Sequence, residues 1–342
     1  MQRLQTYWSV TMLLIMGMAA LPAMAQEGVD NRLYAMIVSG GQNRLMNHER
    51  YWNDCAFLYR TLRQHCGLPK DNILVLMSDG GLPDADMLRS DGRGFASSSA
   101  DLDGDGIPDV TAAATVQMLN LVFQRLSYQL TAADRLFLFF IDHGGTDDGE
   151  TDSFVWLWDE QRFYDYSLAM LLSQLRVEHL AVVMGQCYSG GFIDDLYSDG
   201  RVVMTACRGN EQSWTCPDRD YDEFVYHWTC ALNGADEQGN AVMADTNGDG
   251  LVSMAEAFDY AKSHDRRPET PQYASWPEAL GRQWSLLTLP HNDIHSVVAD
   301  EAPVESWSLD GIRRTDSAKG ALRIVRQNGR VMKKVNGKKV KR

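Results

Sequence analysis

Five short apolar runs, separated by segments of helical periodicity, constrain the fold of this chain more than any other feature. They are residues 33–38, 72–77, 135–141, 179–184 and 201–206. Apolar runs of this length are typical of strands buried on both faces of a sheet. Between and after the runs, apolar spacing predicts helices over residues 49–64, 115–130, 167–175, 223–232 and 254–263. This alternation predicts an α/β fold of three layers, with a mainly parallel sheet flanked by helices.

Two of the predicted strands end in residues that carry chemistry. The third run leads into His143-Gly144, and the fourth leads into Gln186-Cys187. Neighbouring parallel strands lie about 5 Å apart, and sites in open parallel sheets lie outside the carboxyl ends of the strands. The sequence therefore predicts that His143 and Cys187 meet at this edge as a nucleophilic dyad.

The chemistry of such a dyad needs no metal. The imidazole of His143 takes the proton of the Cys187 thiol, and the thiolate then attacks a carbonyl carbon. Gly144 has no side chain to block its N–H, so this group and the N–H of Cys187 are candidates for an oxyanion hole. The alternative is a buried strand cysteine with an unrelated loop histidine. Placement of both residues at strand ends, with one predicted helix between, favours catalysis.

The first 25 residues have the pattern of a secretory signal peptide. A positive start at Arg3 precedes an apolar stretch over residues 10–20 and the sequence Ala23-Met24-Ala25, which suits signal peptidase. The alternative is a membrane anchor, but the apolar stretch is shorter than the roughly 20 residues that a span needs. We therefore expect an exported protein, periplasmic or extracellular, with no transmembrane segment after cleavage.

Charge is divided unevenly along the chain. Residues 311–342 hold 12 of the 32 Lys and Arg residues and one of the 46 acidic residues. The acidic body argues against nucleic acid as a partner and suits cation binding. We predict a signal peptide over 1–25, a catalytic domain over 26–299 and a basic C-terminal tail over 300–342. The tail either folds back on the body, contacts an anionic surface, serves as an export signal or is a solvated end.

Residues 245–256 match the calcium loop of an EF-hand. Loop positions 1, 3, 5, 7, 9 and 12 are occupied by Asp245, Asn247, Asp249, Leu251, Ser253 and Glu256, with Leu251 offering its backbone carbonyl. Glycine stands at position 6. A helix is predicted after the loop but not before it, so the pattern is half of an EF-hand. It predicts one structural Ca²⁺ ion, the alternative being an acidic turn before a helix.

An acidic loop earlier in the chain repeats the beginning of this pattern, and in chain order it is called the first acidic loop below, with residues 245–256 as the second. Its candidate ligands are Asp101, Asp103, Asp105, Ile107 and Asp109, again with a backbone carbonyl at position 7. Position 12 is Ala112, and Pro108 prevents a regular exit helix. A second Ca²⁺ ion here needs a further ligand from elsewhere; the alternative is a solvated acidic loop.

Taken together, these segments resemble the legumain-like cysteine peptidases, relatives of caspases and gingipains that share a caspase-haemoglobinase fold. The resemblance covers residues 33 to about 228. The family has a histidine followed by glycine after one strand, which matches His143-Gly144, and a nucleophilic cysteine after the next, which matches Cys187. Residues 205–213 resemble the stretch that lines the family's specificity pocket. The first strand, its Ser-Gly-Gly end and the following helix are also similar.

The resemblance implies an exported cysteine endopeptidase of caspase-like fold that acts on protein or peptide substrates. It implies a specificity pocket formed by Arg50, Ser213 and Asp222. Asn47 is the best match to the family's imidazole-orienting asparagine, and His48 competes because the local spacing is off by one.

One departure concerns substrate preference. Legumains carry a glutamate two positions before the catalytic cysteine, and this chain has Gly185 there, so one acidic wall of the asparagine pocket is missing. Two other functions remain open on the same residues. One is a transamidase or ligase, in which an amine replaces water; the other is a catalytically inactive, calcium-dependent binding protein.

Overall fold

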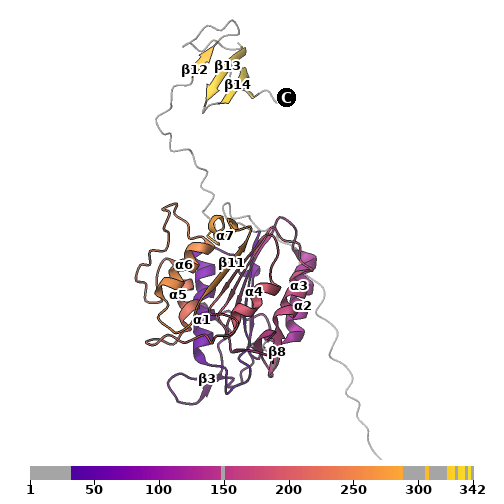
Figure 1. Cartoon of the computed structure of the whole chain (residues 1–342), viewed down its shortest axis with the longest axis vertical. Coiled ribbons are helices and arrows are strands. Elements are labelled where there is room, and N and C mark those ends of the chain that lie inside the picture. Colours follow the sequence, from indigo (N-terminus) through magenta and orange to yellow (C-terminus); the bar gives the residue numbers. More distant parts are fainter. Residues whose placement is uncertain are drawn as a thin grey trace, which may run out of the picture. The chain divides into compact units, whose positions relative to one another are not determined.

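The computed structural model describes residues 32–147 and 151–287, together with the backbone of four strands between residues 305 and 339. The predicted signal peptide lies outside these residues. The chain divides into two compact units, Met1–Pro290 and His291–Arg342, each described here by itself (Figure 1). Within the described part of the chain, no helix combines the length and apolar character needed to cross a membrane.

A six-stranded sheet forms the centre of the first unit. Its strands lie in the order β11-β10-β9-β5-β1-β2, and all neighbours are parallel except β10 and β11. Their bounds are β1 (Leu33–Ser39), β2 (Ile73–Met77), β5 (Arg135–Phe140), β9 (His179–Met184), β10 (Arg201–Thr205) and β11 (Gln272–Trp276). The five parallel strands are the five predicted from apolar runs. The edge strand β11 was not predicted because it mixes polar and aromatic residues and is only half-buried.

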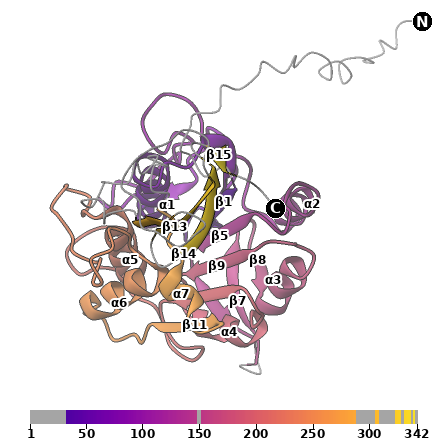
Figure 2. The same cartoon turned by 90° about the horizontal axis from the view of Figure 1, so that it is seen from above.

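Helices cover both faces of this sheet, which gives the predicted three layers (Figure 2). Successive strand residues point to opposite faces, so Phe137 and Phe139 join one core while Leu138 and Phe140 join the other. The first core is covered by α1 (Glu49–Arg60), α5 (Glu223–Asn233), α6 (Met254–His264) and α7 (Leu280–Gln283), the second by α2 (Val116–Gln129), α3 (Asp165–Leu172) and α4 (Phe192–Asp195). Burial on both faces explains why the parallel strands are apolar throughout.

Local signals fix where the helices begin. Thr115 precedes α2, and its hydroxyl accepts a hydrogen bond from the Met118 amide at 3.2 Å. Ser253 precedes α6 and forms a capping box with Glu256, in which each side chain bonds the other residue's backbone amide. At its carboxyl end α1 continues into a π-helical turn over Thr61–His65.

A small antiparallel sheet adjoins the carboxyl edge of the central sheet. It consists of β6 (Gly144–Thr146), β7 (Ser153–Leu157) and β8 (Gln161–Tyr164), while β3 (Met87–Leu88) pairs with β4 (Phe95–Ala96) elsewhere. The hairpin of β7 and β8 turns at Asp159-Glu160, where both residues have positive φ. Strand β6 starts directly after His143, so the small sheet fixes the chain on one side of that histidine.

The second unit contains a four-stranded antiparallel sheet. Its strands are β12 (Glu305–Trp307), β13 (Leu322–Gln327), β14 (Arg330–Val335) and β15 (Lys338–Lys339). The basic tail therefore contains regular structure that its charge alone did not predict.

Candidate active site

His143 and Cys187 follow two neighbouring strands at equal distances from the last paired residues. Strand β5 pairs with β9 in parallel, and Phe140 lies opposite Met184. Each candidate catalytic residue comes three positions later in its own segment. The amide of Gly185 donates to the Phe140 carbonyl at 2.8 Å, so contact between the two segments continues past the strands. The fold thus carries both residues to one carboxyl edge, where the sequence predicts the dyad.

Gly144 lies directly against the backbone of the cysteine. A Cβ atom at this position would collide with the carbonyl oxygen of Cys187 and would come within 2.7 Å of the Gln186 side chain. Only glycine allows the two segments to approach so closely. This contact joins the residue after the histidine to the nucleophile candidate itself.

The imidazole of His143 is enclosed by two other rings. Its centroid lies 5.4 Å from that of His48 and 5.4 Å from that of Tyr51, both edge to face. Burial, followed by the positive charges of Arg50 and His48, lowers the pKa of His143 to about 4, although a hydrogen bond with the Met46 backbone opposes this. Among the described residues, its buried Nε2 atom has no hydrogen-bond partner. A neutral imidazole with an open nitrogen is suited to accept a proton.

Asn47, the predicted orienting residue, uses its side-chain amide nitrogen for other hydrogen bonds. This nitrogen donates to the Ser78 hydroxyl at 2.8 Å and to the Asp86 carbonyl at 3.1 Å. The ring of His48, the competing candidate, contacts the ring of His143. The role of either residue in orienting the imidazole stays a prediction.

Asp142 and Tyr51 were not singled out from the sequence. The buried Asp142 carboxyl accepts hydrogen bonds from the amides of Gly41 and His143, which ties the histidine loop to the loop after β1. Burial raises the pKa of Asp142 to about 8 despite these bonds. Their positions in the sequence could have pointed to them: Asp142 directly precedes His143, and Tyr51 directly follows Arg50.

The cysteine sits on a sharp turn. Its half-buried Sγ lies 3.7 Å from the Ser213 carbonyl oxygen and 3.6 Å from the Ser213 hydroxyl. The next residue, Tyr188, is in the left-handed region with φ 60° and ψ 16°, and its amide donates to the Glu211 carbonyl at 2.8 Å. Such backbone conformations are unfavourable for non-glycine residues and are concentrated at functional sites. The turn presents the thiol beside Ser213, one of the predicted pocket residues.

The other two predicted pocket residues form an ion pair. Arg50 Nε donates to both carboxylate oxygens of Asp222 at 3.2 Å, and its Nη2 donates to the Tyr51 hydroxyl at 2.7 Å. Asp54 accepts from the Asp222 amide at 3.2 Å. Burial, followed by the adjacent Asp222 charge, raises the pKa of Asp54 well above its usual range. The Arg50 guanidinium faces the Asp222 carboxylate directly, and Tyr51 links this pair to His143.

The position of the missing family glutamate is packed with apolar groups. A Cβ atom at Gly185 would lie 2.5 Å from Ile141 Cδ1 and 2.7 Å from Val225 Cγ1. An acidic side chain could enter only by displacing these core residues. The packing of Ile141 and Val225 around Gly185 therefore leaves no room for an acidic side chain at this position of the pocket.

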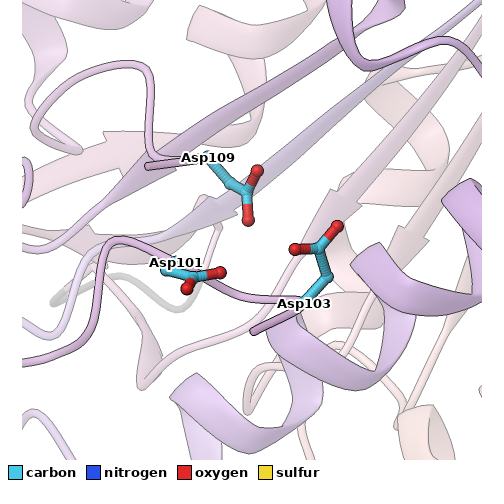
Figure 3. Close-up of side chains that lie close together, drawn as sticks. All are labelled: Asp101, Asp103 and Asp109. Carbon is cyan, nitrogen blue, oxygen red and sulfur yellow. The ribbon is translucent and has the colours of Figure 1, made fainter. Parts of the chain in front are cut away.

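The first acidic loop brings three carboxylates together (Figure 3). Oxygen atoms of Asp101, Asp103 and Asp109 all lie within 4.8 Å of one another, and no other group of three or more such ligands in the described residues does so. Asp109 is buried and also accepts from the Tyr59 hydroxyl at 2.7 Å and the Leu102 amide at 2.8 Å, with Lys70 as its ion-pair partner. Asp105 and Ile107, the other two predicted ligands, are exposed, and the Ile107 carbonyl accepts from Lys70 Nζ at 3.4 Å.

The second acidic loop has the turns of an EF-hand loop, but its last ligand is engaged elsewhere. Asp245 accepts from the amides of Gly248 and Gly250 at 2.7 and 2.9 Å. Both carboxylate oxygens of Glu256 accept hydrogen bonds, one from Thr246 and Asn247 and the other from Ser253. Glu256 would have to exchange these bonds to bind a cation with both oxygens.

Comparison with known proteins gives a family match and likenesses to solved structures. The model of the peptidase C13 family matches residues 33–275, well over half of the chain. The crystal structure of protein GSU0716 from Geobacter sulfurreducens is similar at a TM-score of 0.44 and 13% sequence identity, over 75% of this chain and 99% of that one. A search of curated proteins finds no match.

Proposed function

The chain belongs to the peptidase C13 family, the legumain family, and we propose that it is a cysteine endopeptidase that acts through Cys187 and His143. The observation that carries this assignment is their placement three residues beyond the paired ends of β5 and β9, with Gly144 packed on the Cys187 carbonyl. Family membership alone leaves open which residues act, and this geometry supports the proposal of these two.

The proposed reaction follows from these residues. The neutral His143 takes the thiol proton, and the Cys187 sulfur bonds to the carbonyl carbon of the scissile peptide. The amides of Gly144 and Cys187 are proposed to stabilise the negative oxygen. The carbon–nitrogen bond then breaks, and the imidazolium returns its proton to the leaving amine. Water, deprotonated by the same imidazole, hydrolyses the thioester and releases the free enzyme.

Substitution of the dyad tests the assignment. Cys187→Ala should abolish peptide cleavage, and His143→Ala should reduce it by several orders of magnitude, with both proteins retaining the parent's circular dichroism. Labelling with a thiol-reactive peptide provides an independent measurement, because the other five cysteines are buried. Near-normal cleavage by a folded Cys187→Ala protein would exclude the cysteine-peptidase mechanism. Labelling without turnover would favour the inactive binding protein.

The pH profile tests the state of the histidine. His143 must be neutral to accept the thiol proton, and its pKa is lowered to about 4. We therefore expect kcat/KM to fall on the acid side near pH 4, below the value of about 6.5 for a solvated imidazole. An acid limb at pH 6.5 in a fully folded protein would show that the ring is solvated during turnover.

We propose that the pocket prefers an amide or acidic side chain on the substrate residue before the cleaved bond. An amide can accept from Arg50 and donate to Asp222, which already face each other at 3.2 Å. With no acid at position 185, a basic side chain meets less negative charge than a legumain pocket would offer. A cleavage profile from a peptide library dominated by Arg or Lys would show that other residues form the pocket.

Hydrolysis and aminolysis share the same thioester, so the products distinguish peptidase from transamidase. Turnover of a peptide with an added amine nucleophile, followed by mass spectrometry, should give mainly the free acid. Predominant amide formation at millimolar amine would assign the chain to the transamidase branch of the reaction.

We further propose that Ca²⁺ stabilises the fold without taking part in the chemistry. Both acidic loops offer only oxygen donors, which suit a hard cation. The convergent carboxylates of Asp101, Asp103 and Asp109 support a site in the first loop. The EF-hand spacing from Asp245 to Glu256 supports one in the second, provided that Glu256 releases its present hydrogen bonds.

Export through the predicted signal peptide is likewise a proposal, tested by amino-terminal sequencing of the protein recovered outside the cytoplasm.

A further inference from the structure

Residues 211–214, here named the pocket segment, lie directly beside the candidate nucleophile. The Glu211 carbonyl accepts a hydrogen bond from the Tyr188 amide at 2.8 Å. The Ser213 carbonyl oxygen lies 3.7 Å from Cys187 Sγ. A substrate that reaches the thiol must therefore pass along this segment, and whatever fixes the segment also fixes the shape of the site.

The outer side of the pocket segment is held by the loop over residues 265–270, which follows α6. Thr270 donates to the Glu211 carboxylate from its amide and from its hydroxyl, at 3.0 Å in each case. Glu269 Oε2 accepts from the Trp214 amide at 3.0 Å. Because the Trp214 side chain is 38% exposed, burial of this side chain does little to anchor the segment. Glu269 thus holds the backbone of the residue that follows the thiol contact.

Glu269 is paired with a second carboxyl group, that of Asp265 at the end of α6. The two side chains lie within hydrogen-bonding reach of each other. Asp265 Oδ1 accepts from the Arg267 amide at 2.8 Å. The remaining oxygens, Asp265 Oδ2 and Glu269 Oε1, are buried and find no hydrogen-bond donor among the described residues. Two such carboxylates repel each other, but one proton shared between them satisfies both oxygens.

The surroundings of the pair retain this proton at neutral pH. Burial, followed by the charge of Asp265, raises the pKa of Glu269 to about 10, and burial raises the pKa of Asp265 to about 6. Between these values the pair holds one proton, which is lost as the pH rises toward 10. The other titratable or charged groups that act on the pair from the elements around it are Asp222, Glu223, Arg267 and the Cys207 thiol.

We infer that Glu269 is a positioning residue, which holds the pocket segment for substrate binding through its shared proton with Asp265 and its hydrogen bond from Trp214. The inference rests on the proposed peptidase function and adds a residue to it. A protonated carboxyl can accept from an amide N–H and donate to a neighbouring carboxylate at the same time. Glutamine can make both hydrogen bonds without titrating, whereas alanine can make neither.

Peptide affinity in a Cys187→Ala background measures positioning without turnover. The probe is a capped peptide with one asparagine and no ionisable side chain, titrated in a calorimeter at pH 7. Glu269→Ala should weaken binding about tenfold, the loss expected for one buried hydrogen bond. Glu269→Gln should leave the affinity unchanged, because its amide replaces the shared proton. Glu278→Ala, at an exposed glutamate before α7, is the matched control and should also leave it unchanged.

The pH dependence of this affinity separates positioning from a merely structural role. As the pH rises from 7 past about 10, the background protein should bind the peptide several-fold more weakly, because the pair loses its proton and the two carboxylates separate. Glu269→Gln should keep its affinity over this interval. So should Asp265→Asn, in which the asparagine amide donates to the Glu269 carboxylate. Circular dichroism at each pH checks that the proteins stay folded.

Two results would overturn the inference. One is equal affinity of the background protein and a folded Glu269→Ala variant at pH 7. The other is an alkaline loss of affinity in Glu269→Gln as large as that in the background protein, and this comparison decides alone if Glu269→Ala does not fold. Failure of the proposed function looks different. Near-normal cleavage by Cys187→Ala would exclude the mechanism and leave the affinity comparison intact, whereas no peptide binding by Cys187→Ala would remove the pocket and this inference together.

Discussion

The two acidic loops begin alike and end differently. In each, the aspartate at position 1 accepts hydrogen bonds from the amides of positions 4 and 6, as Asp101 does from Gly104 and Gly106 and Asp245 does from Gly248 and Gly250. Positions 3 and 5 accept from the amides two residues later in both loops. The first six residues of the pattern therefore encode the same turn in two unrelated surroundings.

The difference comes from what surrounds the later positions. Position 9 of the first loop is Asp109, which is buried and bonded to Tyr59 of α1, so that it joins Asp101 and Asp103. Position 9 of the second loop is Ser253, the N-cap of α6, which is paired with Glu256. A local motif thus sets the turn, whereas contacts beyond the motif decide whether its carboxylates converge. Four predictions test this contrast, in order of expected effect.

Position 9 should matter most in the first loop. Asp109→Asn removes a buried charge from Lys70, Tyr59 and a backbone amide, and should lower the free energy of unfolding by about 3 kcal/mol. Ser253→Ala removes a helix cap and should lower it by about 1 kcal/mol. Urea unfolding of both variants without calcium measures the difference. Equal losses would show that Asp109 is no more integral to the fold than a cap.

Calcium should add stability, and single substitutions should show through which loop. An ion that binds only the folded state adds about 2.7 kcal/mol at a hundredfold excess over its Kd. Asp101→Asn and Glu256→Gln should each reduce the rise in Tm. Glu256→Gln should also lower the Tm of calcium-free protein, because an amide nitrogen cannot accept the hydrogen bonds that one of the two carboxylate oxygens now accepts, so the calcium-dependent rise is measured against each variant's own calcium-free Tm. No calcium-dependent rise in the parent would leave both loops as acidic turns; an undiminished rise in Glu256→Gln would assign the ion to the first loop alone.

The glycines at position 6 should be equally important in the two loops. Gly106 and Gly250 both have φ of 84°, and a Cβ atom at either position would meet no neighbouring atom within 4 Å. Replacement by alanine therefore costs only the backbone conformation, about 1 kcal/mol in each case. Denaturant unfolding of the two variants, both calcium-free, provides the comparison. If the two alanine substitutions lowered the free energy of unfolding by amounts that differ several-fold, the two turns would not be equivalent.

Acid should weaken the second loop through Glu256. Burial opposes its ionisation, but hydrogen bonds from Ser253 and Thr246 lower its pKa from about 4.5 to about 2. A carboxyl with a lowered pKa stabilises the folded state above its unfolded pKa, and this contribution is lost as pH falls from about 4.5 toward 2. Glu256→Gln should therefore show a shallower loss of stability over this interval. Parallel curves for parent and variant would show that the pKa of Glu256 is the same in the folded and the unfolded chain.

Much of the central architecture could be predicted, because burial on both faces leaves a direct mark on sequence. The five parallel strands are apolar throughout, and the helices between them show helical periodicity. Strand β11 leaves a weaker mark, since it lies at the edge and pairs only with β10. The contacts of Arg50 with Asp222, 172 positions apart, and of Tyr51 with His143 depend on how α1 packs beside the sheet, which no local pattern encodes.

By itself, the sequence determined the five parallel strands of the central sheet, the two residues that follow β5 and β9, and the turns of both acidic loops. These features depend on neighbours a few residues apart, through apolar periodicity, glycine conformation and side chain to backbone hydrogen bonds. Only the tertiary structure decided that the His48 ring contacts the His143 ring, and that Asp109 joins Asp101 and Asp103. Those outcomes depend on the register and packing of distant segments, where a shift of one residue changes which side chain faces the site.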